Sequence, residues 1–184
     1  MSTNSLVAYL SNDGTVTTSY IHWDGYTTSV GWTLLEHYNT AEKAKELATT
    51  LGYASSLYET IEKSHADRAN TDEAIVYENY LDFEDYIRES SFLEYVYIWV
   101  EHKNEWQVAT WEHTKLDTIS DEGLEFRYDW NGFAKLTDVF TNEAVEAVKR
   151  FRDIADKGNS DYLGYAEELE AGILKYAIEE TTYA

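Results

Sequence analysis

Hydrophobic and polar positions near the N-terminus predict a β-hairpin. Residues 6–10 and 16–22 are rich in β-branched and aromatic side chains, which favour extended strands. Between them, Asn12, Asp13 and Gly14 are residue types that adopt the positive φ angles of a tight hairpin turn. The two strands are therefore expected to pair antiparallel.

A second hairpin is predicted from residues 93–100 and 106–111, which are also rich in β-branched and aromatic residues. A short polar segment separates the two stretches. Because side chains alternate along a strand, Tyr95, Tyr97 and Trp99 would share one face of the sheet.

Two short helices are predicted between the hairpins. Apolar residues recur at helical spacing over residues 30–38 and 41–51. Thr40 is placed to cap the N-terminus of the second helix, and Gly52 is placed to end it.

The C-terminal part of the chain predicts two further helices. From about Phe133 the pattern returns to helical spacing, and Asn142 is expected to cap a helix over residues 143–156 that ends at Gly158. Ser160 or Asp161 would open a last helix that reaches about residue 179. Apolar residues at three- and four-residue intervals indicate the core-facing side of this last helix: Tyr162, Tyr165, Ala166, Leu169, Ile173 and Tyr176.

Together these elements predict an α+β fold, in which a small antiparallel sheet of hairpins is covered by helices and the C-terminal part is helical. The 184 residues include no Pro-, Gly- or Ser-rich linker and no internal repeat. A single domain over residues 1–184 is therefore expected. The absence of Cys excludes a disulfide framework, a zinc ribbon and a thiol nucleophile. Since no long apolar run is present, a soluble protein of the cytoplasm is expected.

Among the features of the composition, the net charge excludes the most classes of function. The chain has 35 acidic and 14 basic residues, a net charge of −21, which opposes direct binding to DNA, RNA or an anionic membrane. A basic protein partner is the natural complement. Residues 59–94 hold 11 acidic and 3 basic residues, so the acidic excess is densest there.

A helix starting near residue 78 would align acidic side chains along one face. At 100° per residue, four carboxylates fall within an arc of about 60°, with axial spacings of roughly 6, 4.5 and 6 Å. Each DNA strand carries one phosphate per roughly 3.4 Å. The four are Glu78, Asp82, Asp85 and Glu89, and the opposite, buried side would carry Val76, Tyr80, Phe83 and Ile87.

Two interpretations of this acidic stripe stay open. Any amphipathic helix has a charged face in water, and residues 74–77 have β character that would break the alignment. A binding role is favoured because no Lys or Arg lies at i,i+4 to relieve repulsion within the stripe, and because the chain's 16 Tyr suit contacts with Arg. The predicted partner-binding residues are Glu73, Glu78, Asp82, Glu84, Asp85, Tyr86 and Glu89.

His22 and Asp24 have a spacing that, on a strand, lets an imidazole and a carboxylate reach one metal ion or one proton. They also fit a His packed at a turn, with the Asp24 carboxylate accepting backbone N–H groups. The sequence has no phosphate-binding Gly-rich loop, no nucleophile elbow and no zinc-protease motif. No catalytic residue, metal or cofactor is therefore predicted, and the protein is expected not to be an enzyme.

One segment resembles a group of small bacteriophage and prophage proteins of unassigned function. The likeness covers about residues 5–60 and rests on the run Tyr-Ile-His-Trp-Asp-Gly-Tyr at 20–26 and on Leu-Leu-Glu-His-Tyr at 34–38. In that group a hairpin carries the first motif and a helix carries the second. The group often has Pro where this chain has Thr27. The resemblance implies a viral origin and no particular activity.

By charge alone, the chain is also similar to phage-encoded inhibitors that mimic DNA and block restriction enzymes or CRISPR effectors. The resulting hypothesis is an anti-CRISPR or anti-restriction type of protein that occupies the basic groove of a host nucleic-acid-binding protein. Two alternatives from other classes are a small metal-binding domain or enzyme centred on His22 and Asp24, and a structural or scaffold component of the virion.

Overall fold

A computed structural model describes residues 3–66, 72–90, 92–120, 123–130 and 132–182. Its strands are β1 (Ser5–Leu10), β2 (Val16–Ile21), β3 (Tyr53–Ala54), β4 (Ile75–Tyr77), β5 (Tyr95–Val100), β6 (Glu105–Ser120), β7 (Gly123–Trp130) and β8 (Ala134–Lys135). Its α-helices are α1 (Trp32–His37), α2 (Ala41–Thr50), α3 (Ile61–Ala66), α4 (Tyr80–Glu89), α5 (Leu136–Asp156) and α6 (Asp161–Thr182). A π-helical turn, η1 (Thr27–Gly31), precedes α1, and a 3-10 turn, η2 (Glu101–Lys103), links β5 to β6.

Both predicted hairpins are present. β1 and β2 pair antiparallel from Ser5 with Ile21 to Leu10 with Val16, and Gly14 has a φ of +93° in the turn between them. β5 and β6 also pair antiparallel, with Trp99 opposite Trp106. Local sequence signals therefore located both hairpins.

The two hairpins are joined through a parallel pair that the sequence did not predict. The sheet order is β3-β2-β1-β5-β6-β7, with β4 also pairing to β2 and β8 to β6. β1 runs parallel to β5, which places Leu6 beside Val96 and Tyr9 beside Trp99. The predicted α+β class is confirmed, and the sheet is mostly antiparallel with this parallel pair at its centre.

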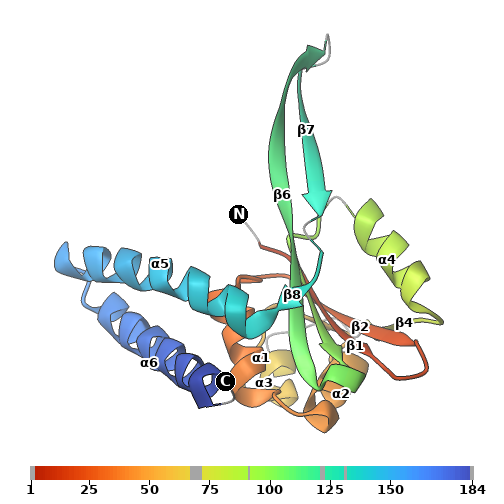
Figure 1. The fold of residues 1–184 in the computed structure, drawn as a ribbon, viewed down its shortest axis with the longest axis horizontal. Helices are drawn as coiled ribbons and strands as arrows, with labels where there is room; N and C mark the ends of the chain where they lie inside the picture. Colours follow the sequence, from red (N-terminus) through yellow and green to blue (C-terminus); the bar gives the residue numbers. More distant parts are fainter. Residues whose placement is uncertain (1–2, 67–71, 91, 121–122, 131, 183–184) are drawn as a thin grey trace.

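Helices lie on both faces of the sheet (Figure 1). On one face the larger core combines Tyr97 and Trp99 of β5 with Leu47 of α2 and Phe140 of α5, all buried. On the other face α4 inserts Phe83 and Ile87 against β1 and β5. The three layers place α4 on one side of the sheet and α1, α2, α5 and α6 on the other.

Thr40 caps α2 as predicted, since its side chain accepts a hydrogen bond from the Lys43 N–H. The prediction that Asn142 caps the next helix was wrong, because α5 begins at Leu136. Buried Leu136, Phe140 and Ala144 continue the i,i+4 apolar pattern N-terminal to Asn142. Packing of this apolar face therefore extends the helix through Asn142, although asparagine favours the N-terminal cap of a helix over its interior.

α6 begins at Asp161 as predicted, and Ala166, Leu169 and Tyr176 are buried. Tyr165 was also predicted to face the core, but its side chain is 58% exposed. It instead contributes to a groove described below.

β6 runs past Trp111, where the sequence predicted its end, and continues to Ser120. Its distal half pairs with β7, with Trp111 opposite Trp130. The resulting long hairpin projects away from the helices and from the rest of the sheet (Figure 1).

Candidate functional site

The predicted acidic segment contains helix α4, and its N-terminus is capped by two reciprocal contacts. The Asn79 side chain accepts a hydrogen bond from the Asp82 N–H at 3.0 Å and donates one to the Asp82 carboxylate at 2.8 Å. A carboxylate in the first turn also complements the helix dipole. Asp82 thus has a structural role that its charge alone did not reveal.

The stripe is shorter than predicted. Glu78 precedes the Asn79 cap and lies outside the helix, so it does not share the helical alignment of Asp82, Asp85 and Glu89. Val76 belongs to strand β4 and is 61% exposed, so its assignment to the buried side was also wrong. The β character of residues 74–77 explains both differences.

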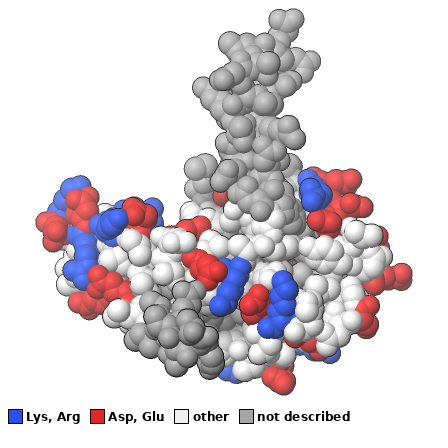
Figure 2. Space-filling model, viewed as in Figure 1, with Lys and Arg blue, Asp and Glu red and all other residues white. Residues whose placement is uncertain are grey.

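Three carboxylates of α4 are exposed to solvent. Asp82, Asp85 and Glu89 are exposed, and among the residues that the structure describes none of them forms an ion pair. Glu84 does, with Arg88 at 3.1 Å. Residues 72–89 contain seven acidic residues and one basic residue. Figure 2 shows this excess of acidic side chains over the α4 end of the molecule, whereas the tip of the α5–α6 pair carries both signs.

Apolar side chains are exposed near these carboxylates. Ile75 is 52% exposed, Leu81 67% and Phe92 48%. Ile75 and Phe92 line a hollow of about 330 Å³ together with Glu73 and Tyr86. Of the seven predicted partner-binding residues, Glu73 and Tyr86 thus meet at one hollow, and Asp82, Glu84, Asp85 and Glu89 lie on the helix beside it.

The motif at residues 22–26 forms a tight connection between β2 and η1. Asp24 has a φ of +57°, and Gly25 lies against the start of β1. The Gly25 N–H donates to the Thr3 carbonyl at 2.9 Å, and the Gly25 carbonyl accepts from the buried Tyr97 hydroxyl at 2.7 Å. These contacts give the Gly of the motif a structural role.

Replacing Gly25 by alanine is expected to lower the free energy of unfolding by about 2–3 kcal/mol. A Cβ atom there would lie 2.7 Å from the Thr3 carbonyl oxygen, a backbone atom that cannot rotate away. Chemical denaturation measures the change. The control is Gly164→Ala in α6, where a Cβ meets nothing within 4 Å and about 0.5–1 kcal/mol of stabilisation is expected. Equal effects of the two substitutions would contradict this explanation.

His22 and Asp24 do not form a metal site with other described residues. No group of three or more His, Cys, Asp or Glu side chains that could hold a metal ion occurs in the described part of the chain. The His22 ring instead contacts aromatic neighbours, with its centroid 4.4 Å from that of Trp23 and its Nδ1 3.3 Å from the Tyr20 hydroxyl. The His22 part of the packed-histidine interpretation fits this geometry, whereas no described backbone N–H donates to the Asp24 carboxylate, as that interpretation had expected.

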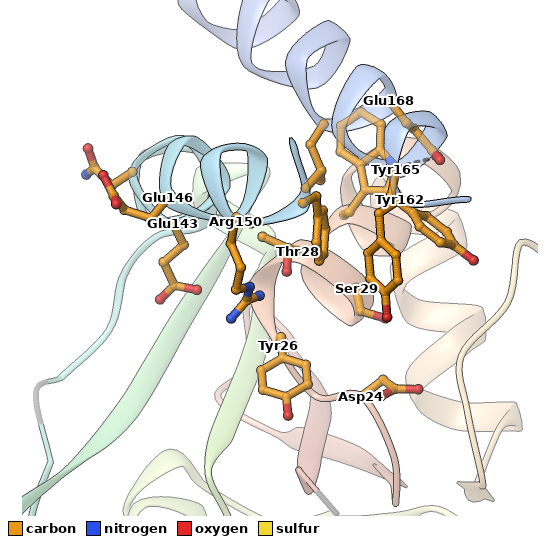
Figure 3. Close-up of a pocket in the computed structure, with 15 residues that line it drawn as sticks. Asp24, Tyr26, Thr28, Ser29, Glu143, Glu146, Arg150, Tyr162, Tyr165 and Glu168 are labelled. Carbon is orange, nitrogen blue, oxygen red and sulfur yellow. Dashed lines mark hydrogen bonds between the residues drawn. The ribbon is translucent and has the colours of Figure 1, made fainter. Parts of the chain in front are cut away.

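Asp24 and Tyr26 belong to a groove that the sequence did not reveal. It has a volume of about 1100 Å³ and runs between residues 24–32 and helices α5 and α6. Figure 3 shows Arg150 and Glu143 extending from α5 towards the side on which Tyr26 lies, and Tyr162 and Tyr165 projecting from the α6 side. Its walls come from segments more than a hundred residues apart, so no local motif could indicate it.

Comparison of the chain with models of known protein families, with curated proteins and with solved structures finds no match. Within its described residues, no helix combines the length and the apolar character needed to cross a membrane.

Proposed function

We propose that this protein is a non-enzymatic inhibitor that binds a basic, nucleic-acid-binding protein of a bacterial host. The α4 surface, defined as Glu73, Glu78, Asp82, Glu84, Asp85, Tyr86 and Glu89, occupies the partner's nucleic-acid groove. The resemblance at residues 20–26 supports a phage origin, and the net charge of −21 supports a basic partner.

The observation that carries the proposal is the row of exposed carboxylates on α4 that form no ion pair with any described residue. Asp82, Asp85 and Glu89 follow one another at roughly 4.5 and 6 Å along the helix axis, an interval of the same order as phosphates along a DNA strand. Glu89 also lies at the C-terminal end of α4, where a negative charge is unfavourable for the helix. Stability alone therefore does not account for this arrangement.

Exposed apolar groups favour a protein partner over a merely solvated acidic face. Ile75 and Phe92, which line one hollow, and Leu81 on α4 are each about half exposed or more, and clustered apolar exposure such as that of Ile75 and Phe92 marks protein interaction surfaces. Carboxylates would supply attraction to basic side chains, and the hollow beside Tyr86 would accept an apolar side chain. Together they match the mixed anatomy of specific interfaces.

The proposal is tested with the triple variant Glu78→Gln/Asp85→Asn/Glu89→Gln, which leaves the Asp82 cap intact. Host proteins retained by the unmodified protein at low salt are identified, and one that binds nucleic acid is purified. The variant is expected to bind this target at least about tenfold more weakly and to compete less well with its DNA or RNA. Its unfolding free energy should be equal or higher, because repulsion on α4 is relieved.

The control variant is Glu42→Gln/Glu46→Gln/Glu62→Gln, which removes the same charge from exposed positions on α2 and α3. It should bind the target within about twofold of the unmodified protein. If both variants bind the target equally weakly, net charge alone accounts for the binding, and the proposal of a defined binding site is contradicted. An affinity that does not change from low to high salt would also contradict the proposal.

A further inference from the structure

We propose that the groove between residues 24–32, α5 and α6 binds an extended basic segment of a protein partner, with an arginine or lysine side chain seated between carboxylates and aromatic rings. This groove is a second binding surface. α5 packs on the face of the sheet opposite to α4, so the inference does not rest on the α4 surface.

The charges that line the groove favour a cation. One basic side chain, Arg150, lies among its lining residues, against four carboxylates: Asp24, Glu143, Glu146 and Glu168. Asp24 is exposed, and no described residue pairs with its carboxylate. It lines the groove from the tight β2–η1 connection.

Contacts orient the other three carboxylates of the groove, and for two of them these contacts do not cancel the negative charge. The Glu143 carboxylate accepts a hydrogen bond from the Thr27 hydroxyl, which ties α5 to η1. Glu168 accepts one from the Trp32 indole N–H at 3.0 Å, which ties α6 to α1. Among the residues that the structure describes, only Glu146 of these three has a cationic partner, Lys149 at 2.6 Å. Two oriented carboxylates therefore remain available to a ligand besides Asp24.

Aromatic rings supply the second component of a cation site. Tyr26 is 45% exposed and Tyr165 58% exposed. Phe151, Tyr162 and Tyr165 contact one another with ring centroids 5.5–6.2 Å apart. An arginine or lysine that lies over such rings gains cation–π attraction in addition to ion pairing.

The size of the groove is compatible with a chain segment. Its volume of about 1100 Å³ lies at the upper end of the range of about 300–1,000 Å³ that is usual for small-ligand pockets, so the groove can hold a short stretch of chain. Arg150, whose guanidinium carbon lies 5.3 Å from the Phe151 ring centroid, occupies part of the aromatic surface. It would compete with a cationic ligand, whereas it would assist an anionic one. Arg150 therefore distinguishes the two ligand classes.

The test uses a fluorescently labelled peptide in which three arginines alternate with glycines, and measures its affinity for the full chain by fluorescence anisotropy. The variant Asp24→Asn/Glu168→Gln is expected to bind about tenfold more weakly. Asn tolerates the positive φ at position 24, and Gln can still accept the Trp32 hydrogen bond. Arg150→Gln is expected to bind the peptide several-fold more tightly.

The matched control is Glu42→Gln/Glu46→Gln, which removes two charges from α2 outside the groove and should leave the affinity within about twofold. The α4 triple variant should also retain peptide binding, so this inference and the proposed function fail independently. Tyr26→Leu is expected to weaken binding several-fold, because its ring is part of the cation site.

Three results would overturn the inference. One is no measurable binding to the unmodified protein, and another is equal weakening by the groove variant and the α2 control. The third is weaker peptide binding by Arg150→Gln, together with tighter binding of an anionic peptide by the unmodified protein, which would assign the groove to an anion.

Discussion

Replacing Phe140 by alanine is expected to lower the free energy of unfolding by about 3–5 kcal/mol. The Phe140 ring is fully buried and stacks on Trp32, with centroids 5.2 Å apart and an interplanar angle of 15°. It also meets Tyr176 edge-on at 6.0 Å. One ring thus joins α1, α5 and α6, and its removal leaves a cavity where the three helices meet.

Urea unfolding followed by circular dichroism measures this loss. The control is Val145→Ala on the same helix, where the side chain is 38% exposed. A change within about 0.5 kcal/mol is expected there, because little packing is lost and alanine favours helix. A loss below about 1 kcal/mol for Phe140→Ala would mean that the three helices do not pack through this ring.

Alkaline solution is expected to unfold the protein through its buried tyrosines. Burial raises the pKa of Tyr38 and of Tyr95 to about 12. Burial raises the pKa of Tyr97 well above its ordinary value of 10, and the negative charges of Glu143 and of Tyr95, once Tyr95 ionises, raise it further. The fold therefore holds these side chains in the neutral, protonated form.

The direction of the pH effect follows from these shifts. In the unfolded chain tyrosine ionises near pH 10, so the stabilisation is fully present below pH 10 and is lost as pH rises towards 12 and above. Between its unfolded and folded pKa, each such tyrosine lowers the free energy of unfolding by up to about 1.4 kcal/mol per pH unit. The loss is expected to be largest for Tyr97, which is fully buried, and smaller for Tyr95, which is only partly buried and keeps some contact with water.

Circular dichroism and tyrosinate absorbance, recorded together from about pH 9 to about pH 12, test this prediction. Loss of helix and ionisation of the buried tyrosines should coincide. Tyr97→Phe serves as the companion variant, because it should reduce the steepness of the pH dependence. It should also lower stability at neutral pH by about 1–3 kcal/mol, since the Gly25 carbonyl loses its buried partner. Full ionisation of all tyrosines near pH 10 with the fold intact would contradict the argument.

Local signals predicted the elements that local chemistry decides. Thr40 caps α2 and residues 12–14 form a turn, as predicted, because a cap and a tight turn depend only on neighbouring residues. Helical spacing was predicted from about Phe133, but the cap was wrongly placed at Asn142, because burial of Leu136 and Phe140 outweighs the capping preference of Asn142. Tertiary packing, which the local pattern does not contain, decided that boundary.

The candidate site was predictable only in part. Asp82, Asp85 and Glu89 could be aligned from helical periodicity, while Glu78 could not be excluded without knowing where the Asn79 cap lies. The groove at Asp24 and Tyr26 was not predictable, since its other wall is formed by residues 142–169. Which distant segments lie side by side is decided by tertiary packing, and the spacing of residues within one segment carries no information about it.

The parallel β1–β5 pair has a consequence for how the chain is made. The first hairpin can form as soon as it leaves the ribosome, but Ser5 can pair with Tyr95 only after about ninety more residues have been made, which takes on the order of ten seconds at typical rates of synthesis. During that interval the inner edge of β1 has unpaired N–H and C=O groups, the kind of edge on which other strands add. The central strand of the finished sheet is thus an edge strand of the nascent protein, and this period carries the greatest risk of misassembly.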